Sequence, residues 1–366
     1  MRSMEIDRRA FLVAAAGAVA VLPSLGRIAR AADAEPLYAS CCKTPDGQFA
    51  VVILDAAGTV RRTELLAGRG HSLAMDRQGR WCVAFARRPG TFALAVDRAS
   101  GTAVHAFETP SDRHFEGHGA FSPDGRLLYA TENAFDDGVA VVGVYDATGG
   151  FRRIGELPGH GIGSHELLLA PDGRSLVVAN GGIATHPDYP RAKLDLDAME
   201  PSIAWIDRDT GDLVERVDPP AALKELSLRH MAVDAAGQAW IGCQWQGDQA
   251  NPVPLLAVYR RGEPLAFVDL PDEARIGLQQ YVGSVAADVT GRRIVIASPV
   301  GGTVLTFDAA SRRLLAKEDL VDGCGAAPFE AGFLLTSGRG TLLREGGHGS
   351  ERIETPYSWD NHIRSI

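Results

Sequence analysis

Histidine recurs at one position of a repeated pattern in this sequence, seven or eight residues before the glycine of a turn. Neutral imidazole is the commonest protein ligand for transition metals, and a thiol would add a soft ligand. If the fold brings equivalent positions of the repeat together, these side chains would form a metal site. The candidate metal ligands are His71, His118, His165, His230, His362 and Cys324.

The pattern around the histidines predicts short β-strands. Turn segments such as Ser122–Arg126 and Ala170–Arg174 are followed by β-rich runs such as Leu127–Ala130 and Leu176–Ala179, which lack a helical period. A repeat of roughly 40 to 50 residues built from short strands is typical of a β-propeller. The innermost strands of a propeller line its central channel, so equivalent histidines are expected to converge at one mouth of that channel.

The number of repeats predicts seven blades. Six complete units begin near residues 70, 117, 164, 229, 283 and 324. Residues 37–66 supply three further strands, and residues 360–366 form a single strand with no blade after it. We therefore predict an all-β, seven-bladed β-propeller closed by pairing of the C-terminal strand with the N-terminal blade, which removes an exposed sheet edge. We expect no helix beyond a turn near residues 221–226.

The N-terminal segment is predicted to be a targeting signal. Arg8 and Arg9 precede a short apolar run that ends at Leu22, and small-residue cleavage patterns end at Ala31 or Ala34. Residues 1–34 therefore resemble a twin-arginine signal peptide, with an ordinary secretory signal as the alternative. Either interpretation predicts that residues 35–366 are exported. We expect a periplasmic protein with no membrane span after removal of the leader.

Composition excludes several classes of function. The formal net charge is −9, and residues 1–34 hold five Arg and three acidic residues, so residues 35–366 carry −11 and should repel nucleic acids. The five cysteines form no CxxC or CxxCH motif, which argues against structural zinc and c-type haem. Pairing of Cys41 or Cys42 with Cys82 stays open. No GxSxG, Walker or HExxH motif occurs, so no catalytic residue is predicted.

Polar residues near the histidines are candidates for ligand binding. The loops that follow the second strands should open on the same face as the histidines, and binding sites favour such loops. Acidic residues nearby, including Glu166, could also orient the imidazole rings. The long loop at residues 181–201 is either a lid or a solvated insertion. The candidate ligand-binding residues are Arg88, Glu116, Glu132, Asn180, Gln244 and Arg229.

A structural role for the histidines is the alternative. In tryptophan-aspartate repeat propellers a Gly-His pair begins each unit and serves hydrogen bonding within the blade, without metal. The pairs Gly70-His71 and Gly117-His118 look similar. The Trp-Asp dipeptide that is typical of those propellers is missing from the ends of the third strands, which favours a binding role.

With these features the sequence resembles the exported domain-of-unknown-function 1513 family. The resemblance rests on the twin-arginine start and on four segments. It implies a periplasmic β-propeller that often accompanies imelysin-type iron-uptake proteins, and no reaction is established for the family. The four segments are Gly117–Gly125, Gly163–Leu167, Ala179–Gly182 and Arg229–Ala232.

The sequence thus leads to one preferred function and two alternatives. We expect a periplasmic binding protein that holds iron or copper at its histidine-lined mouth and acts as an accessory factor in metal acquisition, with other periplasmic iron-uptake proteins as candidate partners. One alternative is a protein–protein interaction scaffold in the envelope without metal. The other is a metal-dependent propeller hydrolase or oxidoreductase.

Overall fold

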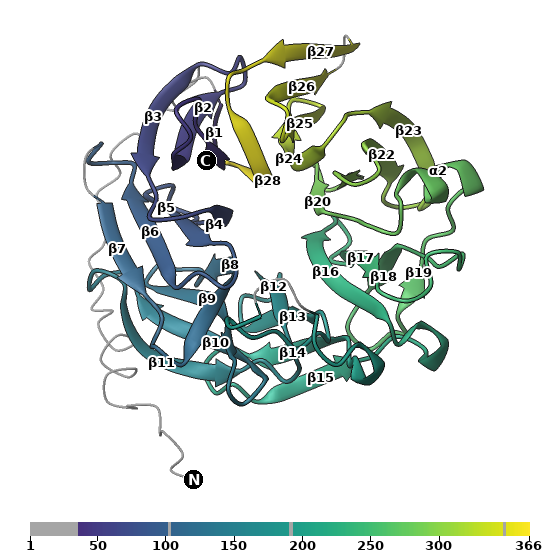
Figure 1. Cartoon of the computed structure of the whole chain (residues 1–366), viewed down its shortest axis with the longest axis horizontal. Helices are drawn as coiled ribbons and strands as arrows, with labels where there is room; N and C mark the ends of the chain where they lie inside the picture. Colours follow the sequence, from purple (N-terminus) through teal and green to yellow (C-terminus); the bar gives the residue numbers. More distant parts are fainter. Residues whose placement is uncertain (1–35, 102–103, 190–192, 347–348) are drawn as a thin grey trace, which may run out of the picture.

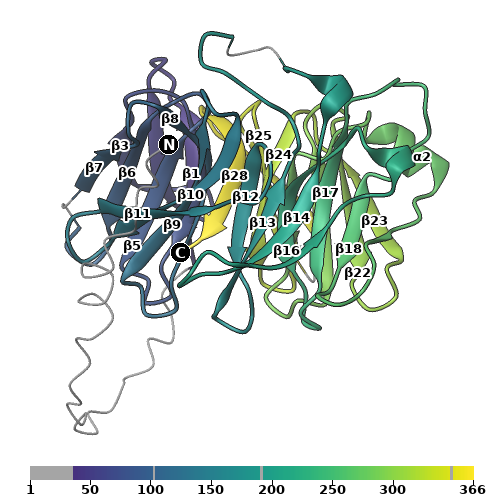
Figure 2. The same cartoon turned by 90° about the horizontal axis from the view of Figure 1, so that it is seen from below.

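Seven four-stranded antiparallel sheets are arranged as blades in a ring (Figure 1). This is a computed structural model, which describes residues 36–101, 104–189, 193–346 and 349–366; the predicted signal peptide, residues 1–34, lies outside the described residues. The ring confirms the predicted all-β, seven-bladed propeller. Viewed from the side, the strands of the blades run roughly parallel to the central axis (Figure 2).

Six blades are continuous in the chain, each with its first strand innermost. The first three are β4 (Gly70–Met75), β5 (Trp81–Ala86), β6 (Phe92–Asp97) and β7 (Val104–Glu108); β8 (Arg113–Phe121), β9 (Leu127–Ala134), β10 (Val139–Asp146) and β11 (Arg152–Pro158); and β12 (Ser164–Leu169), β13 (Ser175–Asn180), β14 (Ser202–Asp207) and β15 (Leu213–Val217). The next three are β16 (Leu226–Val233), β17 (Ala239–Trp245), β18 (Leu256–Tyr259) and β19 (Ala266–Phe267); β20 (Ser284–Ala287), β21 (Arg293–Ser298), β22 (Thr303–Asp308) and β23 (Leu314–Asp319); and β24 (Gly323–Phe329), β25 (Gly332–Ser337), β26 (Thr341–Gly346) and β27 (Gly349–Glu354).

The seventh blade joins the two ends of the described chain. Its strand order is β28 (Ser358–Ser365), β1 (Leu37–Lys43), β2 (Phe49–Asp55) and β3 (Val60–Leu65). Strand β28 pairs with β1 in antiparallel register, with Tyr38 opposite Ser365, and the Ile366 amide donates to the Leu37 carbonyl at 2.9 Å. The predicted closure by the C-terminal strand is therefore confirmed.

Burial follows position within the blade. The second strand β13 is buried along its whole length, because both of its faces pack against neighbouring blades. The outermost strand β3 instead alternates between intermediate and exposed residues. This difference explains why the second strands are continuous apolar runs in the sequence and are the easiest elements to predict.

Helical segments are short and lie in connections. The predicted turn near residue 221 is the 3-10 helix η2 (Ala221–Leu223), and another, η1 (Leu196–Ala198), lies in the long loop. The six-residue helix α2 (Asp272–Gly277) was not expected from the sequence. Pro271 precedes it, and the acidic residues Asp272 and Glu273 in its first turn interact favourably with the positive end of the helix dipole. Within the described residues, no helix is long and apolar enough to cross a membrane.

The cysteines do not form disulfide bonds in this structure. All five are free and buried, which answers the open question about Cys41, Cys42 and Cys82. Burial raises the pKa of Cys82 and of Cys324 to about 12. Thiols with such pKa values stay protonated at neutral pH and are poor nucleophiles.

Candidate metal site in the central channel

Irregular pairing in the inner strands lets adjacent residues reach the channel. A β-bulge re-aims the side chains on the strand that contains it. In β12 the bulge falls at His165, and both this histidine and its neighbour Glu166 contact residues of other blades. Comparable register shifts occur in the other inner strands that carry a candidate ligand. They lie between Gly70 and Leu73, Phe115 and Gly119, Leu228 and His230, and Gly323 and Gly325, and in β28 between Trp359 and Ile363.

One glycine in these bulges makes room for a histidine ring. Gly117 has a φ of +101°, a region that L side chains rarely adopt. A Cβ atom at this position would lie 2.5 Å from Cδ2 of His71. The Gly-His pair of β8 therefore serves packing between two histidine-bearing strands as well as the local turn of the backbone.

Five histidines form one buried cluster at the centre of the ring. Their exposed fractions lie between 1% for His118 and 8% for His165. Ring centroids are 4.6 Å apart for His165 and His230, and 4.8 Å apart for His362 and His118. Two groups of three offer ligand atoms within 4.8 Å of one another, and His118 belongs to both. The first group is His71, His118 and His362; the second group is His118, His165 and His230.

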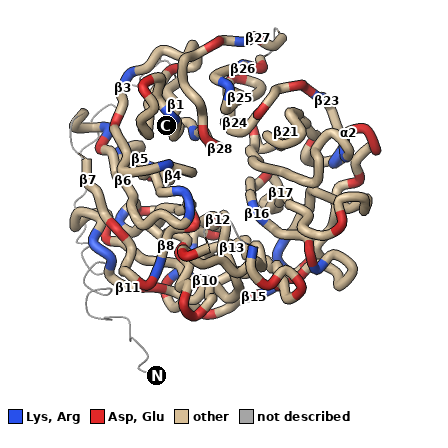
Figure 3. Tube along the Cα trace, in the orientation of Figure 1, with Lys and Arg blue, Asp and Glu red and all other residues tan. Residues whose placement is uncertain are grey.

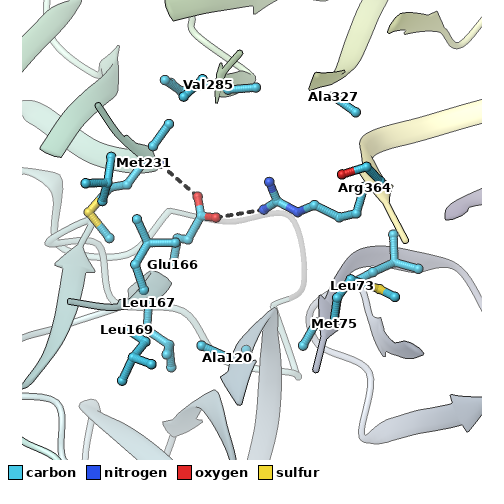
Figure 4. Close-up of a pocket in the computed structure, with 18 of the residues that line it drawn as sticks. Leu73, Met75, Ala120, Glu166, Leu167, Leu169, Met231, Val285, Ala327 and Arg364 are labelled. Carbon is cyan, nitrogen blue, oxygen red and sulfur yellow. Dashed lines mark hydrogen bonds and ion pairs between the residues drawn. The ribbon is translucent and has the colours of Figure 1, made fainter. Parts of the chain in front are cut away.

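The five histidines are buried, and two cavities lie close to the cluster. A cavity of about 440 Å³ lies on one side, lined mainly by apolar inner-strand residues such as Leu73 and Val285 (Figure 4). A cavity of about 160 Å³ lies against His71, His165 and His230. The smaller cavity therefore gives a ligand access to three of the five rings.

Glu166 anchors the cluster from the side of the larger cavity. Its carboxylate accepts hydrogen bonds from the Met231 amide at 2.9 Å and from Arg364 at 3.0 Å (Figure 4). The Nδ1 atoms of His118 and His230 each lie 3.5 Å from one of its oxygens. A carboxylate that faces Nδ1 favours the Nδ1–H tautomer, which directs the Nε2 lone pair away from the carboxylate.

Arginines contact the cluster from the side of the smaller cavity. Arg229 donates to Nδ1 of His165 at 3.2 Å, so the proton of this neutral imidazole must be on Nε2. That Nε2 atom lies 3.3 Å from Nε2 of His230. Arg87 lies 3.4 Å from Nδ1 of His71, which is also 3.6 Å from the carboxylate of Asp360.

Four of the five imidazoles favour the neutral form, namely His71, His165, His230 and His362. Burial lowers the pKa of His71, His165 and His362 well below the usual value, and the Arg87 and Arg229 charges add to this effect for the first two. Burial also lowers the pKa of His230 to about 4, despite the opposing influence of Glu166. Neutral imidazole is the form that binds metals, so these four rings need no deprotonation at neutral pH.

Among the described residues, three ring nitrogens of the cluster lack a hydrogen-bond partner, and one of them, Nδ1 of His230, lies 3.5 Å from the Glu166 carboxylate. The other two are Nε2 of His118 and Nε2 of His362, both buried. Leaving a buried polar atom unsatisfied costs about 1–3 kcal/mol. Both atoms belong to the first group, so a ligand that accepts their lone pairs fits this arrangement. A transition-metal ion is such a ligand.

The contacts of the rings run mostly between blades. His118 of β8 faces Glu166 of β12, and His165 of β12 contacts Arg229 and His230 of β16. This pattern differs from hydrogen bonding within a single blade, which is what the structural alternative required.

Three of the candidate residues lie elsewhere. The Cys324 thiol belongs to neither group and donates to the Asp360 carbonyl at 3.2 Å. Glu132 lies within its blade, where it accepts from Tyr145 at 2.6 Å and from Arg153 at 2.8 Å. Asn180 donates to the Gly159 carbonyl at 3.0 Å. These polar groups satisfy partners inside the scaffold and do not face either cavity, so the prediction of ligand binding by Glu132 and Asn180 is not supported by their placement.

The other four candidates for ligand binding share the smaller cavity. They are Arg88, Glu116, Gln244 and Arg229. Sequence reasoning missed Lys193 and Tyr281, which also line it, and Arg364 beside Glu166. Strand alternation could have indicated Arg364, two residues after His362. Tyr281 reaches the cavity through a β-bridge with Gln244, and nothing local in the sequence signals that long-range pairing.

Fold and cluster together define a seven-bladed β-propeller whose central channel is filled by histidines. The chain belongs to the family described as "Protein of unknown function (DUF1513)", whose model matches residues 64–366. The family resemblance noted in the sequence is therefore confirmed. No curated protein matches the sequence.

Solved structures share the fold at low sequence identity. Hydrazine synthase from Kuenenia stuttgartiensis is similar over 91% of this chain and 99% of its own, with a TM-score of 0.59 and 14% identity. The Cps50 (Swd1) β-propeller domain from Myceliophteria thermophila is similar over 87% of this chain and 92% of its own, with a TM-score of 0.56 and 14% identity. At this identity the likeness concerns the fold alone.

Proposed function

We propose that this protein binds a copper or iron ion through His71, His118 and His362 and acts in the periplasm as an accessory factor in metal acquisition. The observation that carries the proposal is the pair of buried, unpartnered Nε2 atoms of His118 and His362 within a cluster of five imidazoles. Such a cluster has no evident use in packing, because apolar side chains fill a core without unsatisfied polar atoms.

The first group has two unpartnered Nε2 atoms, whereas the second has one. His118 has Glu166 facing its Nδ1 atom, so it can carry the proton there and present Nε2. At His71 one contact must break first, that of Arg87 with Nδ1 at 3.4 Å, after which Asp360 at 3.6 Å can face the Nδ1 proton. In the second group, Arg229 keeps the proton of His165 on Nε2. Metal binding there would require that hydrogen bond to break.

The chemistry of imidazole ligands and the family resemblance support copper or iron as the bound metal. Imidazole suits copper, iron, zinc and nickel, and copper(II) stands highest in the order of divalent affinities. The family resemblance implies an iron-related role. A bound copper or iron ion would supply one-electron redox chemistry, while the propeller would hold it away from bulk water.

Export in the folded state fits this role. The twin-arginine pattern at Arg8 and Arg9 predicts a route that carries folded proteins, so a metal could be inserted before the protein reaches the periplasm.

Metal titration of point variants tests the proposal. Metal-free protein would be titrated with Cu(II) and with Fe(II) in competition with a chromophoric chelator. We expect one ion per chain, with affinity reduced at least tenfold in His118→Gln and in His362→Gln. His105→Gln, which changes an exposed histidine in β7, should bind as the wild type does. Circular dichroism would verify that the variants fold.

The proposal would be contradicted if His118→Gln and His362→Gln bound each metal with the same affinity as the wild type. It would also be contradicted if the wild-type protein showed no saturable binding of either metal.

A further inference from the structure

The smaller cavity beside the cluster carries a strong excess of positive charge. Four cationic side chains line it, Arg87, Arg88, Lys193 and Arg229, against a single carboxylate, Glu116. Figure 3 shows basic positions beside β4 and β16 at the centre of the ring. The chain as a whole has a net charge of −9, so this cavity does not simply reflect a basic protein.

Arg229 is the central feature of this cavity. Its side chain is buried, with the residue only 5% exposed. It donates to the Ser227 hydroxyl at 2.9 Å and to His165 at 3.2 Å, both neutral groups. Among the described residues it forms no ion pair with a carboxylate. Buried charges in proteins are usually paired, because desolvation of an unpaired ion costs several kcal/mol.

Of the neighbouring cations, Arg87 pairs with Asp360 at 3.4 Å, whereas Arg88 and Lys193 are poorly neutralised. Arg88 lies 3.8 Å from Glu116, a long ion pair, and one oxygen of Glu116 has no hydrogen-bond partner. The Lys193 ammonium donates to a neutral amide, that of Gln246, at 2.5 Å. The mutual repulsion of Arg229 and Arg88 adds to burial in lowering the pKa of Arg229 to about 10. An anion in the cavity would relieve this repulsion.

Neutral donors complete the lining. The Tyr281 hydroxyl and the Asn361 amide border the cavity and make no side-chain hydrogen bond to the described chain.

We propose that this cavity binds a small multivalent oxyanion, a polycarboxylate or a phosphate, through Arg229, Arg88 and Lys193. Guanidinium forks match carboxylate and phosphate oxygens in paired hydrogen bonds. The cavity of about 160 Å³ is much smaller than the cavity of about 440 Å³ on the other side of the cluster, which suits a small anion and not a large ligand. This site does not depend on metal binding by the histidines.

Calorimetric titration of metal-free protein tests this site. Metal would be removed on an immobilised chelator, because soluble chelators are themselves polycarboxylates. Citrate and inorganic phosphate would be titrated separately at constant ionic strength, with glycerol as an uncharged control. We expect saturable binding of at least one anion and none of glycerol. Binding of citrate alone identifies a carboxylate site, and binding of phosphate alone identifies a phosphate site.

Matched variants assign the binding to the cavity. Arg229→Gln should weaken binding at least tenfold, and Arg229→Lys should weaken it less because the charge is kept. Arg152→Gln removes the same charge at an exposed position of β11 and should bind as the wild type does. If Arg229→Gln fails to fold, Arg88→Gln replaces it, since the Arg88 side chain is 26% exposed.

Two outcomes would overturn the inference. One is the absence of saturable binding of citrate and phosphate to the wild type. The other is equal affinity in Arg152→Gln and in the cavity variants. Because no metal is present, either outcome leaves the proposed metal site to be judged by its own titration.

Discussion

Glu166 contacts four partners near the channel axis. Its carboxylate bonds to the Met231 amide and to Arg364, and it faces Nδ1 of His118 and of His230. Burial by itself would raise the pKa of Glu166, but His118, together with His230 and Arg364, outweighs burial and lowers the pKa well below the usual value. The group therefore stays anionic at neutral pH and fixes the orientation of two rings.

Replacing this charge tests its positioning role. Glu166→Gln keeps the size of the side chain but weakens the preference for Nδ1–H on His118. Loss of such partners typically reduces metal affinity about 10–100-fold, and we expect a loss in that range by chelator competition. Glu354→Gln, at an exposed position of β27, serves as control. Unchanged affinity in Glu166→Gln would show that the carboxylate does not orient a metal ligand.

Among the elements, the inner strands do the most to build the site, and their bulges explain what the sequence concealed. The spacing of histidine to turn glycine indicated that His71, His118, His165 and His230 are equivalent, and the structure gathers them. The same spacing placed Cys324 with them, but its thiol bonds to the Asp360 carbonyl. Which residue of a bulge faces the axis depends on cross-strand register, which spacing alone does not specify.

Cavity-lining residues that come from distant loops could not be predicted from the sequence either. Tyr281 reaches the smaller cavity through long-range pairing with Gln244, and Lys193 reaches it from the long loop between β13 and β14. By contrast, the strands and the blade count were predictable, because apolar second strands and glycine turns are local features of the chain. The long loop thus contributes to the cavity through Lys193, and Figure 2 shows it above one end of the ring.

The closing strand β28 offers a test at the level of an element. Ile363 is fully buried in a core cluster with Tyr38 and Trp359, so Ile363→Ala should reduce the free energy of unfolding by about 2–5 kcal/mol. Ile353→Ala, in the outer strand β27 and only partly buried, should cost less. Urea denaturation measures both.

Removal of the whole strand gives a stronger effect. Deletion of residues 358–366 exposes the edge of β1, and we expect aggregation because unpaired strand edges template association. Equal stability of Ile363→Ala and Ile353→Ala, or a soluble and fully stable truncated chain, would contradict the closure of the ring by β28.

For the molecule as a whole, the buried histidines make the free energy of unfolding depend on pH. The folded-state pKa values of His71, His165 and His362 lie well below 6.5, and that of His230 is about 4. The unfolded chain therefore takes up protons below about pH 6.5 that the folded protein does not bind. The stability from these neutral rings is present above that pH and is lost as the pH falls toward 4.

Urea midpoints of metal-free protein at pH 7 and pH 5 measure this effect. Each histidine should contribute on the order of 1 kcal/mol per pH unit within that window. Burial raises the pKa of Glu345 to about 7, which acts in the opposite direction, so the comparison needs a variant that keeps Glu345. His71→Gln/His165→Gln should lose less stability between the two pH values than the wild type. An identical loss in both proteins would contradict neutral burial of these rings.

The most direct test of the central claim is an anomalous-scattering measurement on crystals grown with one equivalent of copper or iron. At the absorption edge of the metal, we predict a single strong peak in the channel, within bonding distance of Nε2 of His118 and Nε2 of His362. Crystals that show no peak in the channel at saturating metal, or peaks only on the outer surface, would contradict the account.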